Sequence, residues 1–138
     1  MKRILLACLL INLLSCKNNV ETYIEHIPGY WEIEKVVLAN GTERDYSYNE
    51  TIDYFFISDS LKGIRKKLKP SLDGKFTAFT TSEEFTLVIE NDSLNIYYST
   101  PFDTWKESIL FAGSEALKVI NSNKNVYLYK RYTPLNIE

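Results

Sequence analysis

The chain has 138 residues, of which 25% are charged, and its formal net charge is −2. That length fits a single domain, and the slight acidic excess argues against nucleic acid as a partner. Aromatic residues make up 14% of the chain and include ten tyrosines, a composition that favours β-strands and a bulky core.

The first residues have the pattern of a secretory signal. Lys2 and Arg3 precede an apolar run over residues 4–14, and the small Ser15 precedes Cys16. As a helix, this run would rise only about 16 Å, roughly half of the hydrocarbon thickness, so a signal is favoured over a membrane span.

Residues 13–16, Leu-Leu-Ser-Cys, resemble the lipobox of bacterial lipoproteins. The resemblance implies cleavage after residue 15, diacylglycerol on the Cys16 sulfur and a fatty acyl group, such as palmitate, on its new amino terminus. The alternative is an ordinary signal peptide with a chance cysteine. Cys8 would leave with the signal, so no free thiol would remain for a disulfide, a metal site or a nucleophile.

Residues 17–28 are interpreted as a tether that ends in one helical turn, in which Ile24 and Ile27 face the same way. The predicted division is therefore a signal peptide over 1–15, a lipidated N-terminus and tether over 16–28, and a folded domain over 29–138. Fully extended, this tether would reach about 30 to 40 Å.

From Tyr30 onward, short runs rich in aromatic and β-branched residues recur between turn signals such as Asn40-Gly41 and Asp73-Gly74. Strands are predicted over 30–38, 48–57, 75–81, 84–90, 93–99, 105–111, 115–120 and 125–132. The basic stretch 59–70 is ambiguous, because Leu61, Ile64 and Leu68 have helical spacing while Gly63 and the neighbouring strands favour an extended ribbon. We favour the ribbon.

Eight or nine short strands with short turns predict an all-β fold, an antiparallel up-and-down meander. Closing such a sheet on itself removes its edges, so a single barrel is expected, with a two-sheet β-sandwich as the alternative. The interior of an eight-stranded barrel is either filled by side chains or holds one small ligand.

Pro28-Gly29-Tyr30-Trp31 opens the first strand and resembles the G-x-W signature of lipocalin-like barrels. In that family the tryptophan closes one barrel end and an arginine of the last strand lies across its ring. Trp31 matches the first element and Arg131 the second. The whole chain resembles the small lipocalin-like envelope lipoproteins of Bacteroidota.

These resemblances imply a lipid-anchored envelope protein that binds, without catalysis, a small apolar or amphipathic molecule in or at the mouth of the barrel. Phe56, Leu87 and Tyr98 are predicted to face the interior, and Trp105 to lie on a loop shoulder with Phe102, where they would form a rim or cap the core. The alternative is a packed scaffold whose surface binds an envelope protein or a glycan.

Five cations cluster in this acidic chain: Lys62, Arg65, Lys66, Lys67 and Lys69. They either protect an edge strand from pairing or bind an anion such as a lipid headgroup or carboxylate. In a strand, Arg65, Lys67 and Lys69 would share one face, and these three are the candidate anion-binding residues.

Catalytic signals are weak, so no enzyme activity, cofactor or metal is predicted. His26 is the single histidine, and the neighbouring Glu83 and Glu84 would point to opposite faces of a strand. Lys17 in place of Asp after the lipidated cysteine suggests the outer membrane by the enteric sorting pattern. Ser60 and Ser93 each resemble the Asp-Ser-apolar O-glycosylation motif of Bacteroidota.

Overall fold

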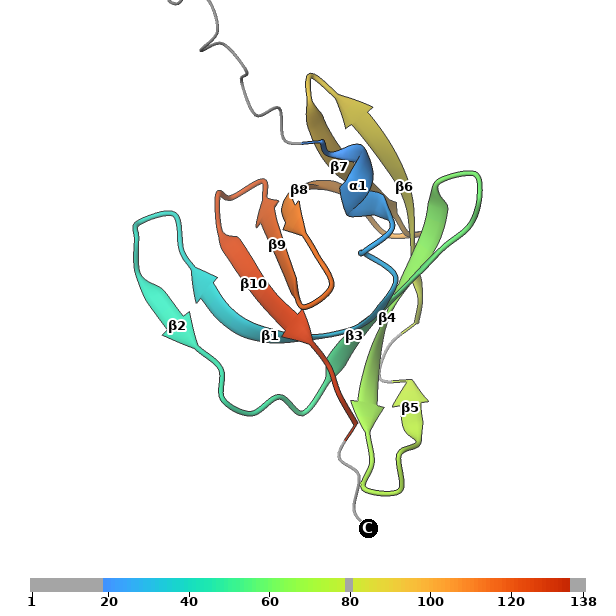
Figure 1. Cartoon of the computed structure of the whole chain (residues 1–138), viewed down its shortest axis with the longest axis vertical. Coiled ribbons are helices and arrows are strands. Elements are labelled where there is room, and N and C mark those ends of the chain that lie inside the picture. The colour runs from blue at the N-terminus through green and yellow to red at the C-terminus, as the bar shows by residue number, and fades with distance from the viewer. Residues whose placement is uncertain (1–18, 79–80, 135–138) are drawn as a thin grey trace, which may run out of the picture.

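The computed structural model describes residues 19–78 and 81–134, so the predicted signal and Cys16 lie outside the described residues. It contains a short helix followed by ten strands (Figure 1). In order they are α1 (Glu21–Ile24), β1 (Gly29–Val37), β2 (Glu43–Asp45), β3 (Ile52–Ile57), β4 (Lys62–Pro70), β5 (Phe76–Ala78), β6 (Glu83–Glu90), β7 (Ser93–Ser99), β8 (Thr104–Ala112), β9 (Ala116–Asn121) and β10 (Val126–Arg131). No described helix is long and apolar enough to cross a membrane.

Eight of the strands form a closed antiparallel barrel. Neighbours run in the order β10-β9-β8-β7-β6-β4-β3-β1, and β10 pairs with β1 to complete the circle. The short strands β2 and β5 are additions that pair with β1 and β4. The predicted barrel is confirmed, and the sandwich alternative is wrong because the first and last strands are hydrogen-bonded to each other.

Four hairpins use the same three-residue turn, in which the third residue has a positive φ angle and follows a type I turn. That residue is Gly41 between β1 and β2 and Gly74 between β4 and β5, as the two turn signals predicted. The equivalent residues are Leu61 between β3 and β4, with φ 59°, and Lys124 between β9 and β10, with φ 65°. Two of the four turns therefore hold a side chain where glycine has no steric cost.

The ambiguous basic stretch is strand β4, as favoured from the sequence. It pairs with β3 so that Asp53 lies opposite Lys67 and Phe55 opposite Arg65. The inward residues of β3 are thus Asp53 and Phe55. The prediction that Phe56 faces the interior is wrong, since Phe56 is 51% exposed while Phe55 is 3% exposed.

The alternation of side chains along β3 indicated the wrong inward face, because aromatic residues also cover the outside of the barrel. Tyr54 packs against Tyr30 with ring centroids 4.8 Å apart, and Tyr30 stacks on Phe76 of β5 at 4.9 Å. Tyr132, after β10, meets the edge of Phe76 at 6.1 Å. This external cluster gives the outward face of β3 the apolar pattern of a core-facing strand.

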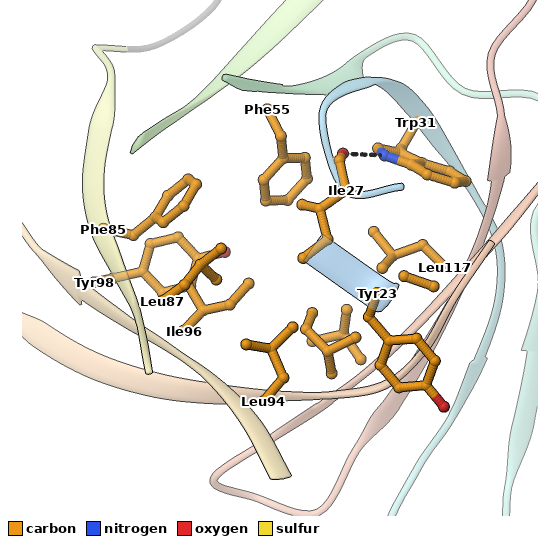
Figure 2. Close-up of a cluster of buried hydrophobic side chains, with 13 residues drawn as sticks. Tyr23, Ile27, Trp31, Phe55, Phe85, Leu87, Leu94, Ile96, Tyr98 and Leu117 are labelled. Atoms are coloured by element: carbon orange, nitrogen blue, oxygen red, sulfur yellow. Dashed lines mark hydrogen bonds between the residues drawn. The ribbon is translucent and has the colours of Figure 1, made fainter. Parts of the chain in front are cut away.

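The apolar core fills one half of the barrel, and α1 closes that end (Figure 2). Ile27 is fully buried and Tyr23 is 9% exposed, and both pack among the core residues of the strands. The predicted helical turn is present, but residues 20–28 are a plug and not a free tether. Burial of their apolar side chains draws this segment into the barrel.

Candidate ligand-binding site at the barrel mouth

Trp31 and Arg131 seal the barrel beside α1. The Arg131 guanidinium carbon lies 3.6 Å from the centroid of the Trp31 ring, which is the contact that the sequence predicted. The Trp31 indole donates to the Ile27 carbonyl at 2.8 Å, and the guanidinium donates to the carbonyls of His26, Pro28 and Ser114.

The glycine of the G-x-W signature has a steric role in this seal. Gly29 has φ +117°, a conformation that L side chains rarely adopt. A Cβ atom there would lie 2.7 Å from Nη1 of Arg131. Glycine is therefore required both by the backbone and by the close approach of the arginine.

Beyond the apolar core, the interior becomes charged at Arg65, whose side chain is only 17% exposed. It donates to Glu83 at 2.6 Å and lies 3.5 Å from Glu107, and its guanidinium covers the Tyr98 ring at 4.4 Å. The next inward cation of β4, Lys67, lies 3.1 Å from Oδ1 of Asp53. The middle of the barrel thus holds a network of buried charges.

Burial and the neighbouring charges shift the pKa values of this network. Burial raises the pKa of Glu107, while the Arg65 guanidinium acts in the opposite direction. Burial would lower the pKa of Arg65, but its interactions with Tyr98, Glu107 and Asp53 outweigh burial and raise it. Burial raises the pKa values of Tyr98 and Tyr129 well above 10, so both phenols are neutral near pH 7.

A cavity of about 390 Å³ opens at the mouth, on the side of the charged network away from α1. Its volume lies within the range of small-molecule sites, about 300–1,000 Å³. Its lining comprises Trp31, Ile33, Tyr46, Tyr48, Asn49, Glu50, Thr51, Asp53, Lys67, Tyr127 and Tyr129. Five of these eleven residues are aromatic, and the charges come from Glu50 and the Asp53–Lys67 pair.

The strands leave room for this cavity because β1 and β3 separate. They pair only over residues 29–31 of β1, after which β1 pairs with the short β2. Residues 46–51 connect β2 to β3 and contribute much of the cavity wall. The Asn49 side chain donates to the Ile33 carbonyl at 2.8 Å and fixes this connection across the opening.

Asp53 is the cavity residue with the least complete hydrogen bonding. It is 6% exposed, and its Oδ1 atom is buried and accepts no hydrogen bond from the described residues. The Lys67 ammonium is within ion-pair distance but lacks hydrogen-bond geometry. The ammonium therefore compensates the charge of this carboxylate, while the hydrogen-bonding capacity of Oδ1 is left for another donor.

The predicted ligand-binding residues do not line the cavity. Leu87 and Tyr98 face the interior as predicted, but they belong to the packed core, at 3% and 2% exposure. Trp105 stacks on Tyr98 with centroids 4.9 Å apart and so covers the core. Phe56 lies outside the barrel, and Phe102 is 95% exposed.

The three candidate anion-binding cations do share the inward face of β4, but each is paired with a carboxylate. Arg65 contacts Glu83 and Glu107, Lys67 contacts Asp53, and Lys69 lies 2.8 Å from Glu50. An anion would have to displace these partners. Only Lys67 of the three lines the cavity.

Sequence reasoning missed the tyrosines of the wall. Tyr127 and Tyr129 alternate inward along β10, in a strand that the sequence predicted, and their period-two spacing was the available signal. Asp53 gave no such signal. A single acidic residue between Ile52 and Tyr54 is normally expected to point toward solvent. Tyr46 and Tyr48 lie in a connection without periodicity.

A second hollow, of about 630 Å³, lies on the outer surface of β6, β7 and β8. Its polar groups are bonded to one another: Asn95 donates to Glu90 and accepts from Ser108, and Tyr97 also donates to Glu90. Although larger, this groove has few unsatisfied groups to offer a ligand, so the mouth cavity is the better candidate.

The described residues contain no group of three or more His, Cys, Asp or Glu side chains placed to hold a metal ion. His26 belongs to the plug, where its side chain lies 3.5 Å from Glu25 and its carbonyl accepts a hydrogen bond from Arg131. Ser60 and Ser93 are exposed at hairpin turns, where the sequence placed them.

A closed meander of eight strands, plugged at one end and open to a small cavity at the other, defines the class of up-and-down lipocalin-type barrels. The profile of the lipocalin-like domain family matches residues 27–124, and the chain belongs to that family. No curated protein matches the chain. A solved structure of a lipocalin-like protein from Bacteroides uniformis is similar at 9% identity, with a TM-score of 0.48, over 78% of this chain and 99% of that one.

Proposed function

We propose that this chain is a lipid-anchored envelope protein that binds, without catalysis, a small amphipathic molecule in the mouth cavity. The cavity carries this proposal, because it combines aromatic side chains with an ion pair whose carboxylate, Asp53, is buried and whose ammonium, Lys67, is half-exposed. The apolar half of the barrel is filled by the core and by α1, which restricts the ligand to the mouth. A long fatty chain would not fit there.

The chemistry of the lining favours a ligand with two different ends. An apolar or aromatic part would pack against Trp31, Tyr127 and Tyr129. A hydroxyl or ammonium group at the other end would donate to the Asp53 carboxylate, which lacks a full set of donors. A half-exposed Lys67 can turn aside to let this group approach.

Native mass spectrometry tests ligand carriage. The protein is extracted gently from its own envelope and compared with the same sample after denaturation. We expect a non-covalent adduct that denaturation removes, and whose mass identifies the ligand. An Ile33→Trp variant, which fills the cavity, should lose the adduct, and a Lys106→Trp variant in the outer groove should keep it.

A wild-type spectrum without an adduct, or an adduct that survives Ile33→Trp, would contradict binding at the mouth. Asp53→Asn provides the finer test of the polar end. It removes the negative charge with little change in volume, so a ligand that donates an ammonium group should bind more weakly to this variant.

The anchor is tested separately at Cys16. One acyl chain holds a protein to a membrane only marginally, whereas two or more hold it firmly. Cys16→Ser should therefore leave the chain unprocessed or release it from the membrane fraction, and unchanged retention would contradict the lipobox interpretation. Fractionation of the wild-type envelope tests the proposed outer-membrane location in the same experiment.

A packed scaffold that binds an envelope protein or a glycan is the second candidate. It is favoured by two side chains at turns, Phe102 at 95% and Leu72 at 76% exposure, which are large apolar groups without cover. A photo-crosslinking residue at position 102 in intact cells should capture one specific partner, and a residue at Lys118 serves as the control. Equal capture at both positions would contradict the scaffold.

A further inference from the structure

Large apolar side chains are exposed at the end of the barrel that α1 closes. We call Leu61, Ile89, Leu110 and Phe111 the apolar rim; they are 36%, 40%, 42% and 45% exposed. They come from the β3–β4 turn, the end of β6 and the end of β8. The function proposed above uses none of them.

Backbone pairing brings the rim residues together around α1. The Leu87 amide donates to the Leu61 carbonyl at 2.8 Å, which places the β3–β4 turn beside β6 two residues before Ile89. Ile89 pairs with Leu94, and Leu94 pairs with Ile109 of β8. Phe111, two residues after Ile109, connects the rim to α1, since its ring and the Tyr23 ring form an edge contact with centroids 5.8 Å apart.

Two local irregularities create this exposure. The register of β8 shifts between Ile109 and Phe111, so that Leu110 and Phe111 both lie outside while Ile109 and Ala112 are buried. Leu61 occupies the left-handed position of its turn, where two equivalent turns have glycine. Regular pairing of β8 would bury one of its two exposed apolar side chains. A glycine at position 61 would carry no side chain at all.

The proposed lipid anchor is very close to this rim. Only two residues lie between Cys16 and Asn19, the first described residue, so three peptide bonds join them and the two Cα atoms can be at most about 11 Å apart. The helix α1 follows Asn19 directly and packs against β8, which carries Leu110 and Phe111 of the rim. A lipid on Cys16 would therefore hold the α1 end of the barrel at the bilayer surface.

We propose that the apolar rim inserts into the interface of a zwitterionic bilayer and fixes the barrel with its mouth directed away from the lipid. This inference depends on the lipid anchor of the proposed function. Carboxylates predominate in α1 and in the turns next to the rim residues: Glu21, Glu25, Asp59, Glu90, Asp92 and Glu115 against Lys62, Lys118 opposite Phe111, and Arg131 beside Glu115. Docking is accordingly apolar, insensitive to salt and weakened by anionic lipid.

The test uses the full chain, purified with its native processing and placed in phosphatidylcholine vesicles that contain a doxyl-labelled phosphatidylcholine. A fluorophore is attached to Leu110→Cys in the rim or to Phe102→Cys in the β7–β8 turn. Cys8 and Cys16 are the native cysteines, and both are removed or acylated in the proposed mature protein. The doxyl lipid should quench the dye at position 110 and not at position 102.

The outcomes separate the docking from the anchor. Protein that floats with the vesicles but shows no quenching at position 110, or equal quenching at both positions, overturns the docking and leaves the anchor in place. Protein that does not float overturns both. Strong quenching at position 110 that survives high salt, and that falls when phosphatidylglycerol replaces half of the lipid, supports the proposal.

Two turn variants form a matched pair for the rim itself. Leu61→Gly and Lys124→Gly make the same change at equivalent turns, but only the first removes a rim side chain. Both should keep the fold, as measured by thermal unfolding. Only Leu61→Gly should reduce quenching at position 110. An equal reduction by Lys124→Gly would show that glycine in such a turn weakens docking through a change in the fold, and it would overturn the role of the Leu61 side chain.

Discussion

Replacing Arg65 with methionine would test whether the buried charge network supports the fold. Methionine keeps much of the side-chain volume but leaves Glu107, whose side chain is 14% exposed, without its cation. Breaking a buried ion pair in this way costs about 3–5 kcal/mol. We expect a loss of about 3 kcal/mol near pH 8, at the low end of that range, because the Glu83 side chain is 32% exposed and can be hydrated.

This loss should depend on pH in a defined direction. Burial already raises the pKa of Glu107 above its usual value, and Arg65 opposes that rise. Without Arg65 the pKa in the folded state rises further above the value in the unfolded chain. The folded state then holds a proton that the unfolded state has lost, so the destabilisation is largest above the folded pKa and fades as the pH falls toward about 4.3.

Urea denaturation at pH 5 and pH 8, followed by tryptophan fluorescence and circular dichroism, measures both effects. Lys66→Met on the opposite face of β4 is the matched control and should cost little at either pH. A second substitution, Glu107→Gln, should restore part of the stability of Arg65→Met at pH 8. A loss below about 1 kcal/mol, or one that is the same at both pH values, would refute the buried-pair reasoning.

Four further substitutions test the fold, each by its free energy of unfolding. Gly29→Ala should cost about 2 kcal/mol, since the new Cβ would press on Arg131 in a strained backbone, and a neutral result would contradict the described seal. Phe55→Ala should cost about 3 kcal/mol and Phe56→Ala about 0.5 kcal/mol, and a reversed order would mean that β3 has the opposite facing. Lys124→Gly should stabilise the protein by about 0.5 kcal/mol by removing a left-handed lysine, and a clear loss would argue against that turn.

Most of the barrel could be predicted because its strands alternate and its turns carry local signals. Asn40-Gly41, Asp73-Gly74 and Asn91-Asp92 all mark hairpins, since these residues tolerate the positive φ angles found there. The seal between Trp31 and Arg131 was also accessible, because it joins the first and last strands, whose identities follow from their order.

The candidate site was less accessible, because the interior of this barrel is not uniformly apolar. In β3 and β4 the inward residues include Asp53, Arg65 and Lys67, so hydrophobic alternation indicates the wrong face. Tyr98 is part of a filled core because residues 20–28 occupy that end of the barrel. These residues form a plug because the Ile27 side chain is buried inside the barrel. Such long-range packing has no local signature in the sequence.

The pairing of β1 with β10 also determines when this protein can fold. The Arg131 side chain donates to the carbonyls of Pro28 and His26, which precede it by 103 and 105 residues. Contacts of such sequence separation form slowly, because a long loop must close before they stabilise the chain. Without β10, β1 and β9 both present unpaired edges, and a chain that stops before Val126 has no strand to cover them. The barrel can therefore reach its native form only once β10 is available, and until then its open edges can pair with other chains.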